Sequence, residues 1–110
     1  MTVYLVFALT GCEPIPVGSS WGGYRNVKGA KIQPAQAVEL ARPYLDRTFQ
    51  LRKSNSELPR SKDKEPIIYV TLKDGYYFIV KDNYPAKSVH FYLDHAVKVH
   101  KNTGETIPPK

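Results

Sequence analysis

The segment formed by residues 67–82 constrains the fold of this chain most strongly, because it has the pattern of a β-hairpin. Two runs of β-branched and aromatic residues flank the dipeptide Asp74-Gly75. A type I′ turn needs positive φ at both central residues, and Asp-Gly is one of the pairs that favour it. The sequence therefore predicts two antiparallel strands joined by a two-residue turn.

Pairing across this turn assigns the side chains to two faces. It places Lys73 opposite Tyr76, and side chains then alternate between the faces along each strand. The more aliphatic face, which we predict to pack in the core, carries Ile68, Val70, Leu72, Tyr77 and Ile79. The other face, called the aromatic face below, carries Tyr69, Thr71, Tyr76, Phe78 and Val80.

The aromatic face lacks the polar character that antiparallel sheets commonly present to water. Either another element of the chain covers this face or a partner does. Aromatic side chains contribute strongly to protein interfaces, because they bury a large rigid area. We therefore predict that Tyr69, Tyr76 and Phe78 bind a protein partner or a second copy of the chain.

One helix is predicted over residues 33–51. Apolar residues recur at three- and four-residue spacing, at Ala37, Val38, Ala41, Leu45 and Phe49. Pro34 suits the first turn of a helix. Pro43 should bend or break the helix, because proline removes a backbone hydrogen bond in a helix interior.

Alternation of apolar and polar residues continues over residues 89–99. This pattern predicts one long strand, or two strands joined by a bulge or bend at Asp94-His95. A tight turn at residues 101–104 and a short strand at residues 105–107 follow. We expect an α+β fold, with one N-terminal helix packed on an antiparallel sheet of three to four strands.

The chain also begins with a recognisable pattern. Residues 3–9 form an apolar run like the core of a secretory signal. The sequence Leu9-Thr10-Gly11-Cys12 resembles the lipobox of bacterial lipoproteins, and this resemblance implies that Cys12 is lipidated and begins the mature chain. The alternative is an ordinary free thiol at the end of a buried N-terminal strand.

Residues 13–31 are rich in Pro, Gly and Ser, which is typical of a flexible linker. The predicted organisation is therefore a signal peptide at residues 1–12, a linker at residues 13–31 and a folded domain at residues 32–110. A chain of 110 residues suffices for one such domain.

The end of the chain carries a family resemblance. Residues 97–107, with the turn Asn102-Thr103-Gly104-Glu105, look like the end of PepSY domains, although His100 stands where that family prefers Asp. The Ala37-x-x-x-Ala41 pattern of the predicted helix also resembles theirs. The resemblance implies a small cystatin-like α+β domain that binds or inhibits other proteins. Small NTF2-like immunity lipoproteins share the order of helix then sheet and are a second candidate.

Few residues suggest catalysis. The sequence has no common nucleophile or metal-ligand motif, and Cys12 lies in the predicted signal. On a regular strand His90 and His100 would lie about 33 Å apart, too far to bind one ion. We predict no enzymatic activity, no cofactor and no metal site.

The predicted function is that of an envelope lipoprotein, facing the periplasm or exterior, that acts as a protein-binding, inhibitory or immunity module. The formal charge of +6 leaves a basic nucleic-acid-binding domain as the alternative, with the sheet aromatics stacking on bases. The sixteen Lys and Arg residues are scattered and form no dense block, which favours the protein-binding prediction.

Overall fold

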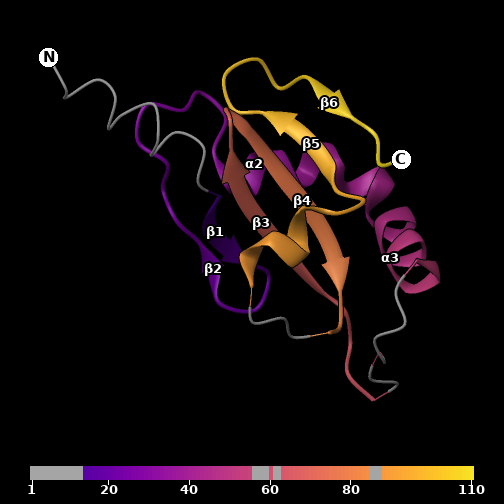
Figure 1. Ribbon diagram of the computed structural model, residues 1–110. Coiled ribbons are helices and arrows are strands. Elements are labelled where there is room, and N and C mark those ends of the chain that lie inside the picture. Colours follow the sequence, from indigo (N-terminus) through magenta and orange to yellow (C-terminus); the bar gives the residue numbers. More distant parts are fainter. Residues whose placement is uncertain (1–13, 56–59, 61–62, 85–87) are drawn as a thin grey trace, which may run out of the picture.

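An antiparallel sheet of six strands and a broken helix form the two layers of the computed structural model, which describes residues 14–55, 60, 63–84 and 88–110 (Figure 1). The strands are β1 (Ile15–Ser19), β2 (Gly23–Tyr24), β3 (Ile67–Lys73), β4 (Tyr76–Asp82), β5 (Val97–His100) and β6 (Thr106–Ile107). Their order across the sheet is β2-β1-β3-β4-β5-β6, and every neighbouring pair is antiparallel. The predicted α+β class is confirmed.

The central hairpin has the predicted register. Lys73 pairs with Tyr76, Val70 with Ile79, and Ile68 with Lys81. Both turn residues have positive φ, at 53° for Asp74 and 82° for Gly75, as a type I′ turn requires. The two predicted faces of the hairpin are therefore the observed ones.

The helix is broken near Pro43, as predicted. It consists of α2 (Pro34–Ala41), a 3₁₀ turn η1 (Arg42–Tyr44) and α3 (Leu45–Ser54). Proline has no N–H to continue the α-helical bonding, so the chain tightens here and α3 starts in a new direction. The Thr48 hydroxyl accepts a hydrogen bond from the backbone N–H of Lys81 at 3.0 Å, which ties α3 to β4.

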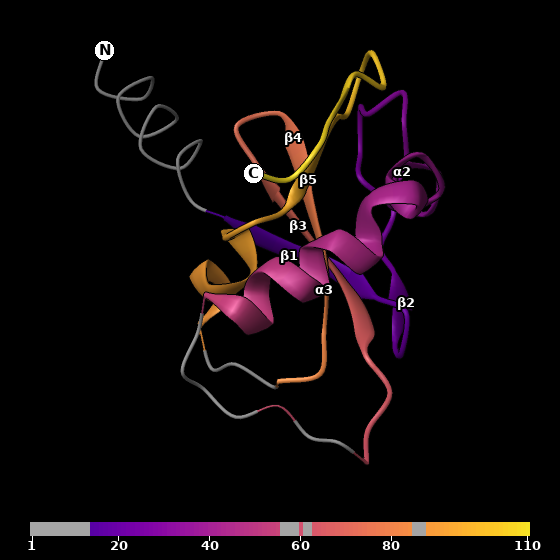
Figure 2. The same ribbon diagram turned by 90° about the vertical axis from the view of Figure 1, so that its right-hand side faces the viewer.

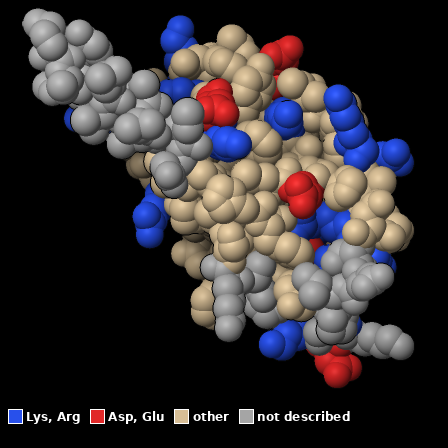
Figure 3. Space-filling view, in the orientation of Figure 1, with Lys and Arg blue, Asp and Glu red and all other residues tan. Residues whose placement is uncertain are grey.

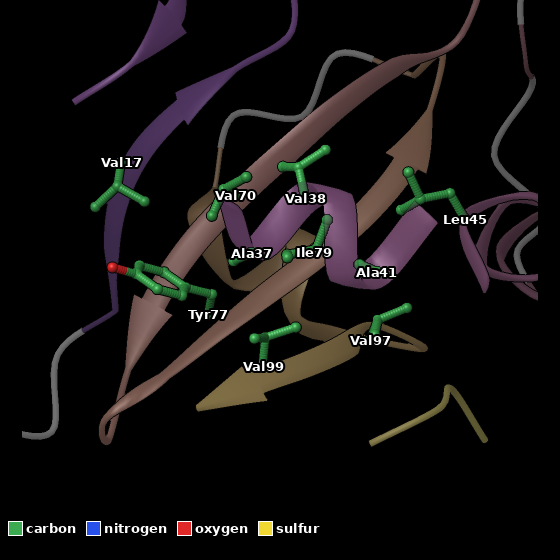
Figure 4. Packing of buried hydrophobic residues seen from close by; sticks show 10 residues of the cluster. All are labelled: Val17, Ala37, Val38, Ala41, Leu45, Val70, Tyr77, Ile79, Val97 and Val99. Atoms are coloured by element: carbon green, nitrogen blue, oxygen red, sulfur yellow. The ribbon is translucent and has the colours of Figure 1, made fainter. Parts of the chain in front are cut away.

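The helices cover the aliphatic face of the sheet, which confirms the predicted core face. Val70, Tyr77 and Ile79 are buried there, with Ile68 and Leu72 partly buried against them. The complete buried cluster is Val17, Ala37, Val38, Ala41, Leu45, Val70, Tyr77, Ile79, Val97 and Val99 (Figure 4). Ala37 and Ala41 let α2 approach the strands closely, because their side chains are small.

The sheet is wider than predicted, and it begins within the predicted linker. Residues 15–24 form β1 and β2 at one edge of the sheet, so the prediction of a flexible linker is wrong for them and the helix is not N-terminal. Val17 belongs to the core. Gly18 has φ +133°, and a Cβ there would lie 2.3 Å from the Gly23 carbonyl oxygen. This glycine therefore permits a tight strand pairing rather than flexibility.

The strand predicted over residues 89–93 is also wrong, because these residues form a 3₁₀ helix, η2 (Val89–Leu93). The Ser88 hydroxyl accepts a hydrogen bond from the His90 N–H at 3.3 Å and begins this helix. The Tyr92 ring packs on the aromatic face instead of pairing in the sheet. His95, with φ +57°, then turns the chain into β5. Figure 2 shows η2 on the opposite side of the sheet from α2.

Candidate functional site

The three residues predicted to bind a partner lie on one face of β3 and β4, opposite the helices. Tyr69 pairs with Val80, Phe78 pairs with Thr71, and Tyr76 pairs with Lys73. Because residues paired across an antiparallel ladder share a face, the structure brings all three onto the aromatic face. Their surroundings differ, and the difference decides which of them is available to a partner.

Tyr69 is largely covered by the chain itself. Its ring stacks on that of Tyr92 from η2, with ring centroids 4.2 Å apart and planes inclined by 19°. Tyr92 also belongs to a second small buried cluster, together with Val80 and Ala96, and Tyr69 packs against this cluster. This burial, together with the neighbouring Tyr92 hydroxyl, raises the pKa of Tyr69 to about 12. Tyr69 therefore serves mainly to seat η2 on the sheet.

Tyr76 lies at the other end of the face, beside the turn that precedes β6. Its ring meets the His100 ring edge to face, with centroids 4.9 Å apart. Its hydroxyl donates a hydrogen bond to the Glu105 carboxylate at 3.1 Å, and this bond raises the pKa of Tyr76. These contacts hold the turn between β5 and β6 against β4.

Phe78 lies between these two sites and lines an open groove of about 310 Å³. We call it the Phe78 groove; its lining residues are Phe78, Leu93, Asp94, His95, Ala96, Lys98, Ile107, Pro108 and Lys110. Leu93 and Ala96 come from the η2 side, whereas Ile107 and Pro108 come from β6 and the residue after it. The Lys98 ammonium lies 5.3 Å from the centre of the Phe78 ring. The groove is thus apolar with basic side chains beside it.

Sequence reasoning found Phe78 but missed the walls of this groove. Residues 89–93 were predicted as a strand, so Leu93 was placed in the sheet rather than beside Phe78. Pro108 follows the short strand predicted at residues 105–107 and was not assigned to any site. Figure 3 views this side of the molecule and shows a wide uncharged area with charged side chains around it.

A buried ion cluster lies where α3, the end of β4 and η2 meet, and sequence reasoning missed it as well. The Asp82 carboxylate is fully buried and lies 2.7 Å from Nε of Arg52 and 2.7 Å from Nε of Arg60. Arg52 Nη1 also donates to the carbonyl oxygens of Phe91 at 3.0 Å and Asp94 at 2.7 Å. One arginine therefore joins the helix, the sheet and η2.

The only sequence signal for this cluster is an acidic residue at the end of an apolar strand. Asp82 is separated from Arg52 by thirty residues, and no local pattern links them. The predicted helix ends at residue 51, whereas α3 continues to Ser54 and carries the Arg52 side chain inward.

Cys12, predicted to be lipidated, lies outside the described residues, as does the predicted signal peptide. Among residues 14–55, 60, 63–84 and 88–110, no group of three or more His, Cys, Asp and Glu side chains could hold a metal ion. In the same part of the chain, no helix is both long and apolar enough to cross a membrane.

Comparisons with protein-family models, with curated proteins and with solved structures gave no match to this chain.

Proposed function

We propose that this chain is a non-enzymatic module that binds a protein partner through the Phe78 groove. The observation that carries the proposal is the groove itself, an apolar hollow on the side of the sheet opposite α2 and α3. Interfaces commonly combine a buried aromatic side chain with a polar rim. Lys98 and Lys110 lie beside the apolar lining, so a partner that inserts an apolar side chain and carries acidic groups would complement this site.

We further propose that the module belongs to the cell envelope, where a lipid on Cys12 would hold it at a membrane surface, facing the periplasm or exterior. The lipobox-like sequence Leu9-Thr10-Gly11-Cys12 supports this part of the proposal. The order of strand, tight turn and short strand over residues 97–107 supports a PepSY-like, cystatin-like domain. An NTF2-like immunity lipoprotein is the second candidate family, and either family fits an inhibitory role.

The binding test compares two phenylalanines that are both half-buried. Phe78→Ser alters the groove, whereas Phe49→Ser alters α3 and serves as the matched control. A partner is first isolated from the envelope of the source organism and purified, and its affinity for each variant is measured by calorimetry. Loss of an interface anchor should weaken binding by about thirtyfold or more for Phe78→Ser and hardly at all for Phe49→Ser. Equal affinities for the two variants would contradict the proposal.

The purified parent protein and its Phe78→Ser variant also distinguish other possible occupants of the aromatic face. If the chain binds itself, the parent will elute as a dimer in size-exclusion chromatography and Phe78→Ser as a monomer. If it binds nucleic acid, affinity for single-stranded DNA or RNA will fall steeply with salt concentration. Either result would replace the proposed protein partner.

The membrane part has a separate test. Cys12→Ser should move the protein from the membrane fraction to the soluble fraction of the cells, because the lipid would be attached to the Cys12 sulfur atom. If the variant fractionates like the parent, Cys12 is an ordinary thiol and the lipoprotein proposal fails.

A further inference from the structure

The turn between β1 and β2, at one edge of the sheet, presents the only tryptophan of the chain to solvent. Trp21 is 85% exposed, against 50% for Ile15 and 43% for Leu40, the other large hydrophobic residues found exposed in the described part of the chain. Isolated apolar residues on a surface are common, so exposure alone does not mark a site. The backbone, the neighbours and the place of Trp21 in the chain are what distinguish it.

Hydrogen bonds hold the backbone on both sides of Trp21. The Ser19 hydroxyl accepts a hydrogen bond from the Gly22 N–H at 3.2 Å and closes the turn. The Ser20 N–H donates to the Ile68 carbonyl oxygen at 2.9 Å, and the Ser20 hydroxyl accepts from the Ile68 N–H at 2.9 Å. A side chain carried on a fixed turn loses less freedom on binding than one carried on a mobile loop. The turn therefore holds the indole ring outward, ready for contact.

Basic side chains flank the indole ring. Trp21 lines two open hollows, of about 510 Å³ and about 570 Å³. Arg25 lines the first, whereas Lys64 and Glu65 line the second, and all three residues are exposed. Among the described residues neither Arg25 nor Lys64 forms a salt bridge. Two cationic groups and one carboxylate therefore surround the ring, with the cations in excess.

Charge and position both favour a lipid surface as the contact of Trp21. The chain has a formal charge of +6, and anionic lipid headgroups attract basic proteins. Cys12 precedes Trp21 by nine residues, so even a fully extended chain would keep the two within about 30 Å. A membrane that holds a lipid on Cys12 would thus be within reach of this turn.

We propose that the turn of residues 20–22 inserts the Trp21 ring into the headgroup region of an anionic membrane, with Arg25 and Lys64 beside lipid phosphate groups. An indole ring suits this region, because it has an apolar body and one N–H donor. The inference concerns a different surface from the Phe78 groove and rests on the proposed function only for the envelope location. A second membrane contact beside the lipid anchor would fix the orientation of the domain.

The experiment measures the fluorescence of Trp21 in the full chain, where no other tryptophan contributes. Vesicles of phosphatidylcholine and phosphatidylglycerol in equal parts are added, with brominated acyl chains as quenchers. We expect the emission to shift to shorter wavelength and to be quenched, and both effects to be much weaker with phosphatidylcholine alone. Unchanged emission with the anionic vesicles would overturn the proposal.

A double variant controls for binding through any other surface. Trp21→Phe combined with Leu40→Trp moves the tryptophan to an exposed position of α2. Leu40 lies beside Gly104, in the turn between β5 and β6 at the opposite edge of the sheet. Its emission should not respond to the anionic vesicles. Equal quenching in the parent and in the double variant would contradict a specific role of the turn.

Charge variants test the role of the flanking side chains. With vesicles in excess, the ratio of quenched to unquenched Trp21 measures insertion. Arg25→Gln should lower this ratio about fivefold, the effect of one basic group near an anionic surface. Arg47→Gln, which removes the same charge from an exposed position of α3, should hardly change it. Glu65→Gln should raise it. Equal effects of the two arginine variants would contradict the proposed contact with lipid phosphates.

The outcome is independent of the tests of the proposed function. If Trp21 is not quenched although Cys12→Ser releases the protein from the membrane fraction, this inference fails and the lipid anchor stands. If Cys12→Ser has no effect, quenching of Trp21 by added vesicles still supports the inserted turn. A shift of Trp21 emission on adding the purified partner, with none on adding vesicles, would assign the turn to a protein interface and overturn the inference.

Discussion

The two faces of the central hairpin are closed in different ways, although the same two strands form both. On the aliphatic face, α2 and α3 cover Val70, Tyr77 and Ile79 with apolar side chains. On the aromatic face, the short helix η2 covers Tyr69 and Val80 and leaves Phe78 beside an open groove. Apolar packing and the hydrogen bond between Lys81 N–H and the Thr48 hydroxyl close the first face, whereas the second depends on a buried ion cluster that holds η2 in place. The comparison shows that the aliphatic face forms the stabilising core, whereas the chain itself covers the aromatic face only in part.

The largest effect should come from removing the charge that holds η2. Asp82→Asn keeps the shape of the side chain but removes the buried negative charge that pairs with the guanidinium groups of Arg52 and Arg60, which should lower the free energy of unfolding by about 4 kcal/mol. The control is Asp46→Asn, which removes an exposed carboxylate paired with Lys81 at 2.7 Å. Urea unfolding measures both variants. If they are equally stable, the cluster does not hold the aromatic face closed.

Neighbouring residues of β4 provide a direct contrast between the faces. Ile79→Ala leaves a cavity under α2 and should cost about 3 kcal/mol. Phe78→Ser removes a larger side chain from the half-open face but should cost only about 1 kcal/mol. The difference between their unfolding midpoints in urea tests the comparison. A reversed order of stability would mean that Phe78, not Ile79, belongs to the principal core.

Strand β1 contributes Val17 to the core on the aliphatic face. The pairing of β1 with β2 at this edge of the sheet can therefore be tested separately. Gly18→Ala places a Cβ 2.3 Å from the Gly23 carbonyl oxygen, and this clash should cost about 2 kcal/mol more than the same change at an open position. Gly29→Ala is the control, because its φ of +83° is also positive but nothing lies within 4 Å of its Cβ position. Hydrogen exchange should speed up at residues 15–24 in the first variant. Unchanged exchange there would show that β1 and β2 pair without needing this glycine.

The smallest effect concerns the covered end of the aromatic face. The pKa of Tyr69, raised to about 12 by burial and by Tyr92, lies above the usual value near 10. The unfolded chain therefore loses this proton first, and Tyr69 makes stability fall as pH rises from about 10 to 12. Tyrosine ¹³Cζ shifts should report the late titration, and Tyr92→Ala should lower it. Titration of Tyr69 near 10 in the parent would show that η2 does not cover it.

The aliphatic face was predicted from the sequence better than the aromatic face, and the reason is physical. Alternation around Asp74-Gly75 is a local pattern, so the register of β3 with β4 and the choice of core face follow from neighbouring residues. Pro43 acts within its own turn, so the break in the helix is equally local.

The features that sequence reasoning missed depend on distant contacts. The glycines of residues 18–23 have the composition of a linker, and only their pairing with β3 shows that they form strands. The alternation over residues 89–93 suits a strand, yet the contact between Tyr92 and Tyr69 selects a 3₁₀ helix. Leu93 and Ile107 come together at Phe78 only through the fold, so the aromatic face could be predicted but the shape of its groove could not.

Solvent access to the two faces tests the central claim most directly, because it needs neither a partner nor an unfolding experiment. A neutral, soluble paramagnetic agent is added, and the relaxation of side-chain protons is measured by NMR. We predict strong enhancement at the Phe78 ring and at the methyl groups of Leu93 and Ile107, which line the groove. The methyl groups of Ile79, Val97 and Val99 should be almost unaffected beneath the helices. Protection of Phe78 and Ile107 equal to that of Ile79 would contradict the account, because both faces would then be closed by the chain itself.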